Sequence, residues 1–327
     1  MENKRKMIIF GPVPSRRLGQ SLGINNIPPK ICTYSCIYCQ IGRTNNMQIN
    51  RREFYKPEEI INAVYEKVKK AKEKKEHIDY FTFVPDGEPT LDINLGKEIE
   101  MLRSLSTGTK IAVITNSSLI WKEEVREDLY KADWVSLKID SVNQDAWRRI
   151  DRPHGSLKLD KIWDGITEFS RTFKGELATE TMLIQDVNDD VKKVEQIADL
   201  IAKLNPKKSY VSIPTRPPAE KNVKSSTEYE INKAYQIFKE RGIDVEYLIG
   251  YEGNAFAYTG NVEEDLLSIT SVHPMREDGI KNFLTKAKSD WNVIKKLIDE
   301  GKLIQVKYED EKFYMRKLTR DKSNYSV

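Results

Sequence analysis

The chain has 327 residues, of which 39% are hydrophobic and 32% charged, and its 54 Lys and Arg stand against 50 Asp and Glu. No apolar run approaches the roughly 18 residues of a membrane helix, and the apolar stretch 7–10 is shorter than a signal-peptide core of about 7–15 residues. These features argue against a membrane protein and predict a cytoplasmic one, long enough for a large α/β barrel and a small appendage. The net charge of +4 permits an acidic partner without requiring one.

A loop after a short predicted strand, Ser21–Ile27, contains every cysteine of the chain. Cys32, Cys36 and Cys39 have the spacing C-x3-C-x2-C, and Tyr38 directly precedes the last of them. Thiolates packed this closely can bind one inorganic centre, and an iron–sulfur cubane takes four sulfur ligands. Three protein ligands would leave one iron open to a small molecule.

Other interpretations of the cysteines stay open at this point. A structural zinc site would need a histidine as its fourth ligand, and the three histidines, His77, His154 and His273, all lie far from the loop in sequence. A disulfide leaves one cysteine over and lacks a secretory signal. Cysteines used as small core residues would have to cluster within eight positions by accident. A metal centre is therefore favoured.

A second motif comes one helix and one strand after the cysteines. Pro57 begins the helix in the first-turn position that proline favours, and Ile78–Val84 is the strand. The strand leads into Gly87-Glu88-Pro89. The glycine permits a backbone to approach a ligand closely, and Glu88 offers a carboxylate to an ammonium group. The alternative is that Asp86-Gly87 forms an ordinary turn with no role in ligand binding.

The alternation of strands and helices continues to residue 241. With the strand before the cysteines it gives six β/α units, which predicts an α/β fold with a partial (β/α)6 barrel, similar to a TIM barrel but not closed. The further strands are predicted at Ile111–Thr115, Trp134–Ile139, Glu176–Ile184 and Ser209–Ile213. The further helices are predicted at Lys97–Leu105, Glu123–Tyr130, Leu157–Phe173, Val191–Leu204 and Glu228–Arg241.

Polar residues gather where these strands end, the edge at which parallel β/α folds bind ligands. Ser136, Lys138 and Asp140 alternate along one strand and therefore share one face. If that face lines the barrel, Lys138 and Asp140 are candidate catalytic groups that meet the substrate, since charges are rarely buried without a partner or ligand. A structural ion pair of Lys138 with Asp140 or with Glu180 is the alternative.

Arginines flank the same edge. Residues 214–218 contain three prolines and predict a rigid turn, which aims Arg216, a third catalytic candidate, across the barrel mouth. Arg16 and Arg17 lie beside the cysteine loop in sequence, where they either face an anionic substrate or form a solvated pair.

The end of the chain predicts a second domain. Residues 1–246 form the barrel with its lead-in, 247–261 a linker, and 262–327 a winged-helix-like domain. From residue 260 to 327 there are 13 Lys and Arg against 12 Asp and Glu. DNA binding, which requires a basic footprint, is therefore disfavoured, while RNA binding, peptide binding or a fixed cap over the barrel stay open. The elements predicted there are helices at Glu263–Val272, Arg276–Ala287 and Asp290–Glu300 and strands at Leu303–Tyr308 and Lys312–Arg316.

The cysteine motif and the Gly87-Glu88-Pro89 segment resemble those of the radical SAM superfamily. The stretch 14–24 resembles uncharacterised iron–sulfur oxidoreductases loosely similar to wyosine-base synthases, and the core resemblance covers about residues 11–220. It implies a [4Fe-4S] cluster on the three cysteines, with S-adenosylmethionine (SAM) on the open iron. An electron would split SAM into methionine and a 5′-deoxyadenosyl radical that abstracts hydrogen, chemistry that no side chain performs unaided.

The resemblance also implies contacts with SAM and an electron donor. The Gly87-Glu88-Pro89 segment would hold the amino group of SAM, although Asp86 replaces the usual small residue before it. A ferredoxin or a flavodoxin-like protein would supply the electron. The further positions expected to contact SAM are Tyr38, Asn116, Ser117 and Ser136.

One departure from the resemblance restricts the reaction. Archaeal wyosine-base synthases carry further cysteines for a second cluster, whereas this chain has none outside 32–39. That argues against tricyclic-base synthesis, sulfur insertion and twin-cysteine methylation. We expect a one-cluster enzyme acting on a macromolecule, with RNA slightly ahead of a peptide. An activating enzyme that places a glycyl radical on a partner is one alternative, and a cluster-sensing winged-helix regulator is another.

Overall fold

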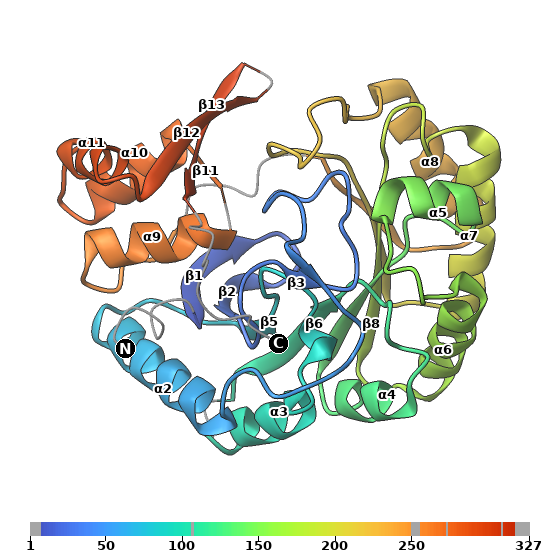
Figure 1. The fold of residues 1–327 in the computed structure, drawn as a ribbon, viewed down its shortest axis with the longest axis horizontal. Helices are drawn as coiled ribbons and strands as arrows, with labels where there is room; N and C mark the ends of the chain where they lie inside the picture. The colour runs from blue at the N-terminus through green and yellow to red at the C-terminus, as the bar shows by residue number, and fades with distance from the viewer. Residues whose placement is uncertain (1–7, 106–107, 250–255, 273, 309, 318–327) are drawn as a thin grey trace.

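The computed structural model describes residues 8–105, 108–249, 256–272, 274–308 and 310–317. Its largest feature is an eight-stranded sheet that curls into a partial barrel (Figure 1). Strand β1 pairs antiparallel with β2, and every following pair from β2–β5 to β9–β10 is parallel. In sheet order the strands are β1 (Ile9–Ser15), β2 (Gly19–Ile24), β5 (Tyr80–Phe83), β6 (Lys110–Thr115), β7 (Trp134–Lys138), β8 (Glu176–Met182), β9 (Lys208–Ser212) and β10 (Val245–Leu248).

Helices cover the outer face of this sheet (Figure 1). Helix α2 (Pro57–Glu73) has the features that its sequence predicts. Pro57 begins the helix, Glu58 and Glu59 lie in its first turn, and Ile60 and Val64 are buried. The other helices of the barrel are α3 (Leu95–Ser104), α4 (Glu123–Leu129), α5 (Gln144–Asp151), α6 (Leu159–Thr172), α7 (Val191–Leu204) and α8 (Glu228–Glu240).

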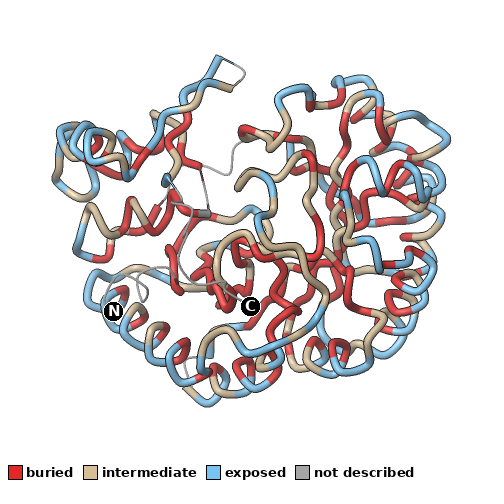
Figure 2. Tube along the Cα trace, viewed as in Figure 1, coloured by how far each residue is buried: buried red, intermediate tan, exposed pale blue. Residues whose placement is uncertain are grey.

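Side chains alternate between the two faces of the strands. Val135 and Leu177 belong to the main core, which includes apolar residues of the helices. Trp134, Ala178 and Tyr210 instead form a small cluster drawn largely from the strands, inside the barrel. Buried residues accordingly run through the strands and along the inward faces of the helices (Figure 2). Residues in step with Trp134 on β7 therefore face the barrel interior.

The expected partial barrel is confirmed, but it has more elements than the six predicted units. Strand β1 falls in a stretch that the sequence marks as turns, because Pro12 and Pro14 interrupt it; as an edge strand with an irregular register between Phe10 and Val13 it tolerates them. Strand β10 has only four residues, too few for a clear alternation. Helix α5 was not predicted either, although Asn143 caps its N-terminus by accepting hydrogen bonds from two backbone N–H groups.

A small α/β module follows the barrel. Its short sheet has the order β11-β13-β12, with one strand, β11, that was not expected. Its elements are α9 (Val262–Val272), β11 (Met275–Arg276), α10 (Glu277–Lys286), α11 (Asn292–Asp299), β12 (Leu303–Tyr308) and β13 (Glu311–Arg316). The winged-helix assignment remains a proposal that rests on this element order.

The expected linker is partly wrong. Tyr247 lies within β10, and Phe256 is fully buried in a second core that also contains Phe10 and Val13 of β1. The Lys67 side chain of α2 donates to Asp265 of α9 at 2.7 Å. The module is therefore packed against β1 and α2, while 250–255, the middle of the predicted linker, lies outside the described residues. None of the helices described is long and apolar enough to span a bilayer.

Candidate active site

The cysteine loop is held by the end of helix α5. The backbone N–H of Ser35 donates to the carbonyl of Asp151 at 3.0 Å, and that of Ile37 donates to the carbonyl of Ile150 at 2.9 Å. The side chain of Asp151 is buried and accepts a hydrogen bond from Cys36 Sγ at 3.3 Å. The sequence analysis missed Asp151, although the apolar spacing of Ala146, Trp147 and Ile150 after an Asn cap could have revealed the helix that carries it.

All three cysteines are free and half-buried. Asn116 connects the first of them to β6, because its Nδ2 donates to Thr33 Oγ1 at 2.8 Å and lies 3.5 Å from Cys32 Sγ. Within the described ranges, no three His, Cys, Asp or Glu side chains are grouped as ligands of one metal ion. His273, one of the histidines considered for zinc, lies outside these ranges.

Burial raises the pKa of each thiol. It raises that of Cys32 to about 12, with the nearby Glu88 carboxylate adding to the effect, and that of Cys36 well above its ordinary value, with Asp151 adding. Metal binding requires deprotonated cysteines, so a cluster would provide the positive charge that these thiolates otherwise lack. Three sulfur donors in one short loop fit an iron–sulfur cluster that keeps one iron open.

The Gly87-Glu88-Pro89 segment lies directly against the start of the cysteine loop. A Cβ on Gly87 would come within 1.9 Å of the Ile31 carbonyl oxygen, and the N–H of Glu88 donates to that same oxygen at 3.2 Å. The close approach that the glycine was expected to permit is therefore made, in part, by the protein's own backbone.

The Glu88 carboxylate is buried and accepts hydrogen bonds from within the protein. Its Oε1 accepts from Thr90 Oγ1 and Thr115 Oγ1, both at 2.6 Å, and its Oε2 accepts from the Asn116 N–H at 2.8 Å. Burial raises the pKa of Glu88, and these hydrogen bonds oppose that rise. Glu88 thus fixes Asn116 next to the cysteines, while its expected contact with the amino group of SAM stays a prediction.

Two predicted cofactor-binding hydroxyls are buried and have no hydrogen-bond partner in the described part of the chain. Ser117 follows β6 and Ser136 lies on β7, on the face that points into the barrel; each is 1% exposed. Neither Oγ has a hydrogen-bond partner among the residues that the structure describes. Because buried polar groups are normally hydrogen-bonded, these two hydroxyls are the kind of group that a bound ligand would satisfy.

The barrel interior contains an ion cluster around Glu180. Lys138 Nζ donates to Glu180 Oε1 at 2.7 Å, Arg17 pairs with Oε2, and Ser212 Oγ donates to Oε1 at 3.1 Å. Burial by itself would raise the pKa of Glu180, but Lys138 and then Arg17 outweigh it and lower that pKa to about 2. The structural ion pair that was one alternative for Lys138 is therefore present. Arg17 is not solvated but pairs with the same carboxylate, and its contact with an anionic substrate stays a prediction.

Tyr38 and Asp140 lie next to this cluster. The Tyr38 hydroxyl donates to Asp140 Oδ2, and the Met182 N–H donates to Asp140 Oδ1 at 2.8 Å. Lys138 Nζ lies 5.0 Å from the centre of the Tyr38 ring, within cation–π range. Burial raises the pKa of Asp140, and Lys138 opposes that rise. The third catalytic candidate, Arg216, donates to Gln40 Oε1 at 2.7 Å and thus reaches the residue that follows Cys39.

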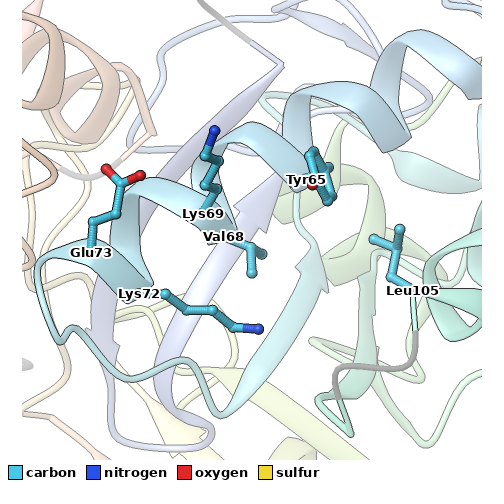
Figure 3. A pocket seen from close by; sticks show the side chains of 6 residues that line it. All are labelled: Tyr65, Val68, Lys69, Lys72, Glu73 and Leu105. Carbon is cyan, nitrogen blue, oxygen red and sulfur yellow. The ribbon is translucent and has the colours of Figure 1, made fainter.

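Another groove lies away from these residues, on the exposed side of α2. It contains none of the candidate site residues and offers no sulfur ligand. It has a volume of about 310 Å³ and is lined by Tyr65, Val68, Lys69, Lys72, Glu73 and Leu105 (Figure 3).

Comparison with known proteins identifies the class. A family model described as the radical SAM superfamily matches residues 26–201, more than half of the chain. A solved radical SAM methyltransferase from Sphaerobacter thermophilus has the same fold, with a TM-score of 0.52 at 18% identity over 70% of this chain and 66% of that one. The protein is therefore an enzyme of the radical SAM type, a class that uses SAM and an iron–sulfur cluster.

Comparison with individual relatives identifies the family within this superfamily. A UPF0026 protein of Methanocaldococcus jannaschii is 51% identical over 97% of this chain and 98% of its own length. A protein named GTPase Obg from Brachyspira hyodysenteriae is 36% identical, but this chain covers only 43% of it. A probable dual-specificity RNA methyltransferase RlmN of Streptococcus equi is 24% identical over 65% of this chain and 60% of that protein. Within the radical SAM superfamily, the chain belongs to the UPF0026 family.

Proposed function

We propose that the protein binds one [4Fe-4S] cluster through Cys32, Cys36 and Cys39 and cleaves SAM reductively, so that hydrogen is abstracted from a macromolecular substrate. The observation that carries this proposal is the position of the three thiols in one loop, whose first cysteine, Cys32, contacts Asn116 at the strand edge. At that edge the Ser117 hydroxyl is buried with no hydrogen-bond partner among the described residues. When bound, the cluster would supply the electron that divides SAM into methionine and a 5′-deoxyadenosyl radical.

The chain's own residues would bind and orient the cofactor. Asp151 contacts Cys36 and Asn116 contacts Cys32, so two of the cysteines are held by side chains from outside the loop. Ser117 and Ser136 would donate hydrogen bonds to SAM, because their hydroxyls are buried and no described residue accepts from them. Tyr38, fixed by Asp140, would contact the cofactor from the cysteine loop, and the Gly87-Glu88-Pro89 segment would contact it from the end of β5.

The charged groups inside the barrel would meet the substrate. Glu180 holds the ammonium of Lys138 and the guanidinium of Arg17 in fixed positions, and preorganised charges of this kind need no rearrangement when a substrate binds. Asp140 accepts from Tyr38 and from the backbone of β8, so it is oriented as well. Arg216 would act at the rim, next to Gln40.

We favour RNA over a peptide as the substrate. The radical SAM relative from Streptococcus equi carries the name of an RNA methyltransferase, whereas the likeness to Streptococcus suis SuiB bound to its precursor peptide, at 12% identity, extends to the fold alone. The electron would come from a ferredoxin or a flavodoxin-like protein.

Anaerobic reconstitution tests the proposal. Cluster-loaded protein is reduced with dithionite in the presence of SAM, and 5′-deoxyadenosine is measured against a Cys32→Ala/Cys36→Ala/Cys39→Ala variant. We expect product from the wild type and none from the variant. Lack of product from protein with an intact, reduced cluster would falsify the proposal. A glycine-centred spin signal on a co-purified protein would instead identify an activating enzyme.

A further inference from the structure

A second groove lies at the rim of the barrel, close to the candidate active site. It has a volume of about 300 Å³ and lies between α5, the cysteine loop and the segments that follow β8 and β9. The residues that line it include Ile37, three arginines and two amides: Arg148, Arg149, Arg152, Gln185 and Asn222.

Two arginines of this groove, Arg148 and Arg149, carry positive charges that no described carboxylate pairs with. Arg148 and Arg149 are exposed, and the described part of the chain provides neither with an ion pair or a side-chain hydrogen bond. Arg152 pairs with Glu220, a carboxylate that already accepts two hydrogen bonds from Arg43. Glu220 therefore serves Arg152 and Arg43, and among the residues that the structure describes nothing occupies Arg148 and Arg149, which are left for a ligand.

The surroundings of the groove are basic as well. Lys221 and Lys224 are exposed beside Asn222. The acidic residues nearby in sequence include Asp145 and Asp186, both exposed, Asp189, which is partly buried, and Asp151, which is buried. The lining of the groove itself contains three arginines and no acidic residue. The basic footprint that the near-neutral C-terminal module lacks is thus found on the rim of the barrel. Such a footprint is the electrostatic mark of nucleic-acid binding.

The groove also shares its walls with the candidate active site. Ile37 lines the groove, while its neighbour Tyr38 reaches Asp140 inside the barrel. Helix α5 contributes Arg148 and Arg149 to the groove and Asp151 to the contact with Cys36. A chain bound in the groove would therefore lie against Ile37, which directly follows Cys36 in the cysteine loop.

We propose that this groove binds a nucleotide of a single-stranded RNA substrate, an inference that rests on the proposed function and locates its substrate. Arg148 and Arg149 bind the phosphate, which the planar guanidinium fork fits well. The base lies over an apolar floor that includes Ile37, Ile184 and Val223, and the amides of Gln185 and Asn222 reach its edge. An acidic peptide would use only the arginines, and a duplex is too wide for a groove of this volume.

Fluorescence anisotropy with the full-length, cluster-loaded protein tests this inference. The probe is a fluorescein-labelled, single-stranded RNA 12-mer of mixed sequence, titrated at several salt concentrations. We expect Arg148→Gln/Arg149→Gln to weaken binding about tenfold near 0.1 M salt. The slope of log affinity against log salt should become shallower by about 0.7, since both arginines contact one phosphate and each phosphate contact on a single strand contributes about 0.7.

The matched control is Lys69→Gln/Lys72→Gln, which removes two exposed positive charges from the groove on α2. Equal affinities of the two double variants would overturn the inference, as would competition by a polyglutamate 12-mer, or by DNA of the same sequence, as strong as that of unlabelled RNA. Failure of wild-type protein that makes 5′-deoxyadenosine to bind RNA overturns this inference and the preference for an RNA substrate, and leaves the proposed cleavage of SAM in place. Groove-dependent RNA binding by protein that does not cleave SAM supports it and contradicts only the proposed function.

Discussion

The hydroxyl of Tyr38 donates a 2.5 Å hydrogen bond to Oδ2 of Asp140. The two residues are 102 positions apart in sequence, and the bond joins the cysteine loop to the end of β7. The aromatic residue of the cysteine motif is thus fixed by a carboxylate at the sheet edge where ligands bind in this class of fold.

Tyr38→Phe removes this hydrogen bond and leaves a buried carboxylate short of a donor. We expect a loss of about 1.5–3 kcal/mol in the free energy of unfolding, the range for hydrogen bonds to charged groups, measured by urea unfolding. Because the bond to Tyr38 also lowers the pKa of Asp140, that pKa should rise further in the variant. Tyr65→Phe, at an exposed position, is the control. Equal stabilities of the two variants would contradict the role given to the hydrogen bond.

Glu180→Gln tests the ion cluster inside the barrel. The variant leaves Lys138 and Arg17 without their shared carboxylate, and breaking a buried pair in this way costs about 3–5 kcal/mol. The pKa of Glu180 falls from an ordinary 4.5 to about 2 in the folded protein. Its contribution to stability is therefore complete above about pH 4.5 and disappears as the pH falls from there toward 2.

Urea unfolding between pH 3 and 7 measures this effect. The free energy of unfolding of the wild type should fall below about pH 4.5 more steeply than that of Glu180→Gln. Glu176→Gln changes an exposed residue of the same strand and should behave as the wild type does. A variant with the same pH profile as the wild type would show that Glu180 is not held ionised by its neighbours.

Ser136→Ala tests whether a buried, unused hydroxyl serves the cofactor. Since Ser136 Oγ has no partner among the described residues, its loss should leave the melting temperature unchanged or slightly raised. The affinity of the cluster-loaded protein for SAM should drop about five- to tenfold, the loss of one hydrogen bond of about 1–1.4 kcal/mol. Anaerobic equilibrium dialysis measures the affinity.

Ser212→Ala is the comparison for this variant. The Ser212 hydroxyl donates to Glu180 Oε1 at 3.1 Å and lies 3.2 Å from the carbonyl of Thr181, so its removal should lower the melting temperature. If Ser136→Ala lowers the melting temperature instead and leaves SAM affinity intact, its hydroxyl has a structural role and not a cofactor-binding one.

Asp265→Ala tests how the C-terminal module is attached. Asp265 accepts hydrogen bonds from Lys67 Nζ at 2.7 Å and from the Thr259 hydroxyl at 2.6 Å, and its side chain is 2% exposed. Without it, Lys67 of α2 keeps a largely buried charge that has lost its counter-ion, which should cost about 3 kcal/mol. Calorimetry should show one transition shifted to lower temperature, whereas Asp299→Ala, at an exposed site on α11, should have no effect. Two separated transitions in the wild type would mean that the module folds independently.

Much of the barrel could be predicted because its signals are local. Helix α7, Val191–Leu204, was predicted with its observed bounds, since its apolar residues repeat at helical spacing between an Asp cap and an Asn in the left-handed conformation. The elements that escaped prediction have weak local signals: β1 contains two prolines and β10 has four residues. Their partners in the sheet, and not their own sequences, make them strands.

By itself, the sequence determined the cysteine spacing, the Gly87-Glu88-Pro89 segment after a strand, and the set of polar residues at the strand ends, because spacing and alternation are properties of neighbours in the chain. Only the tertiary structure decided that Lys138 pairs with Glu180 and that Arg17, 163 positions away from Glu180, completes the cluster. Such pairings depend on the register of adjacent strands and on the curvature of the sheet, which long-range packing sets after the local elements have formed.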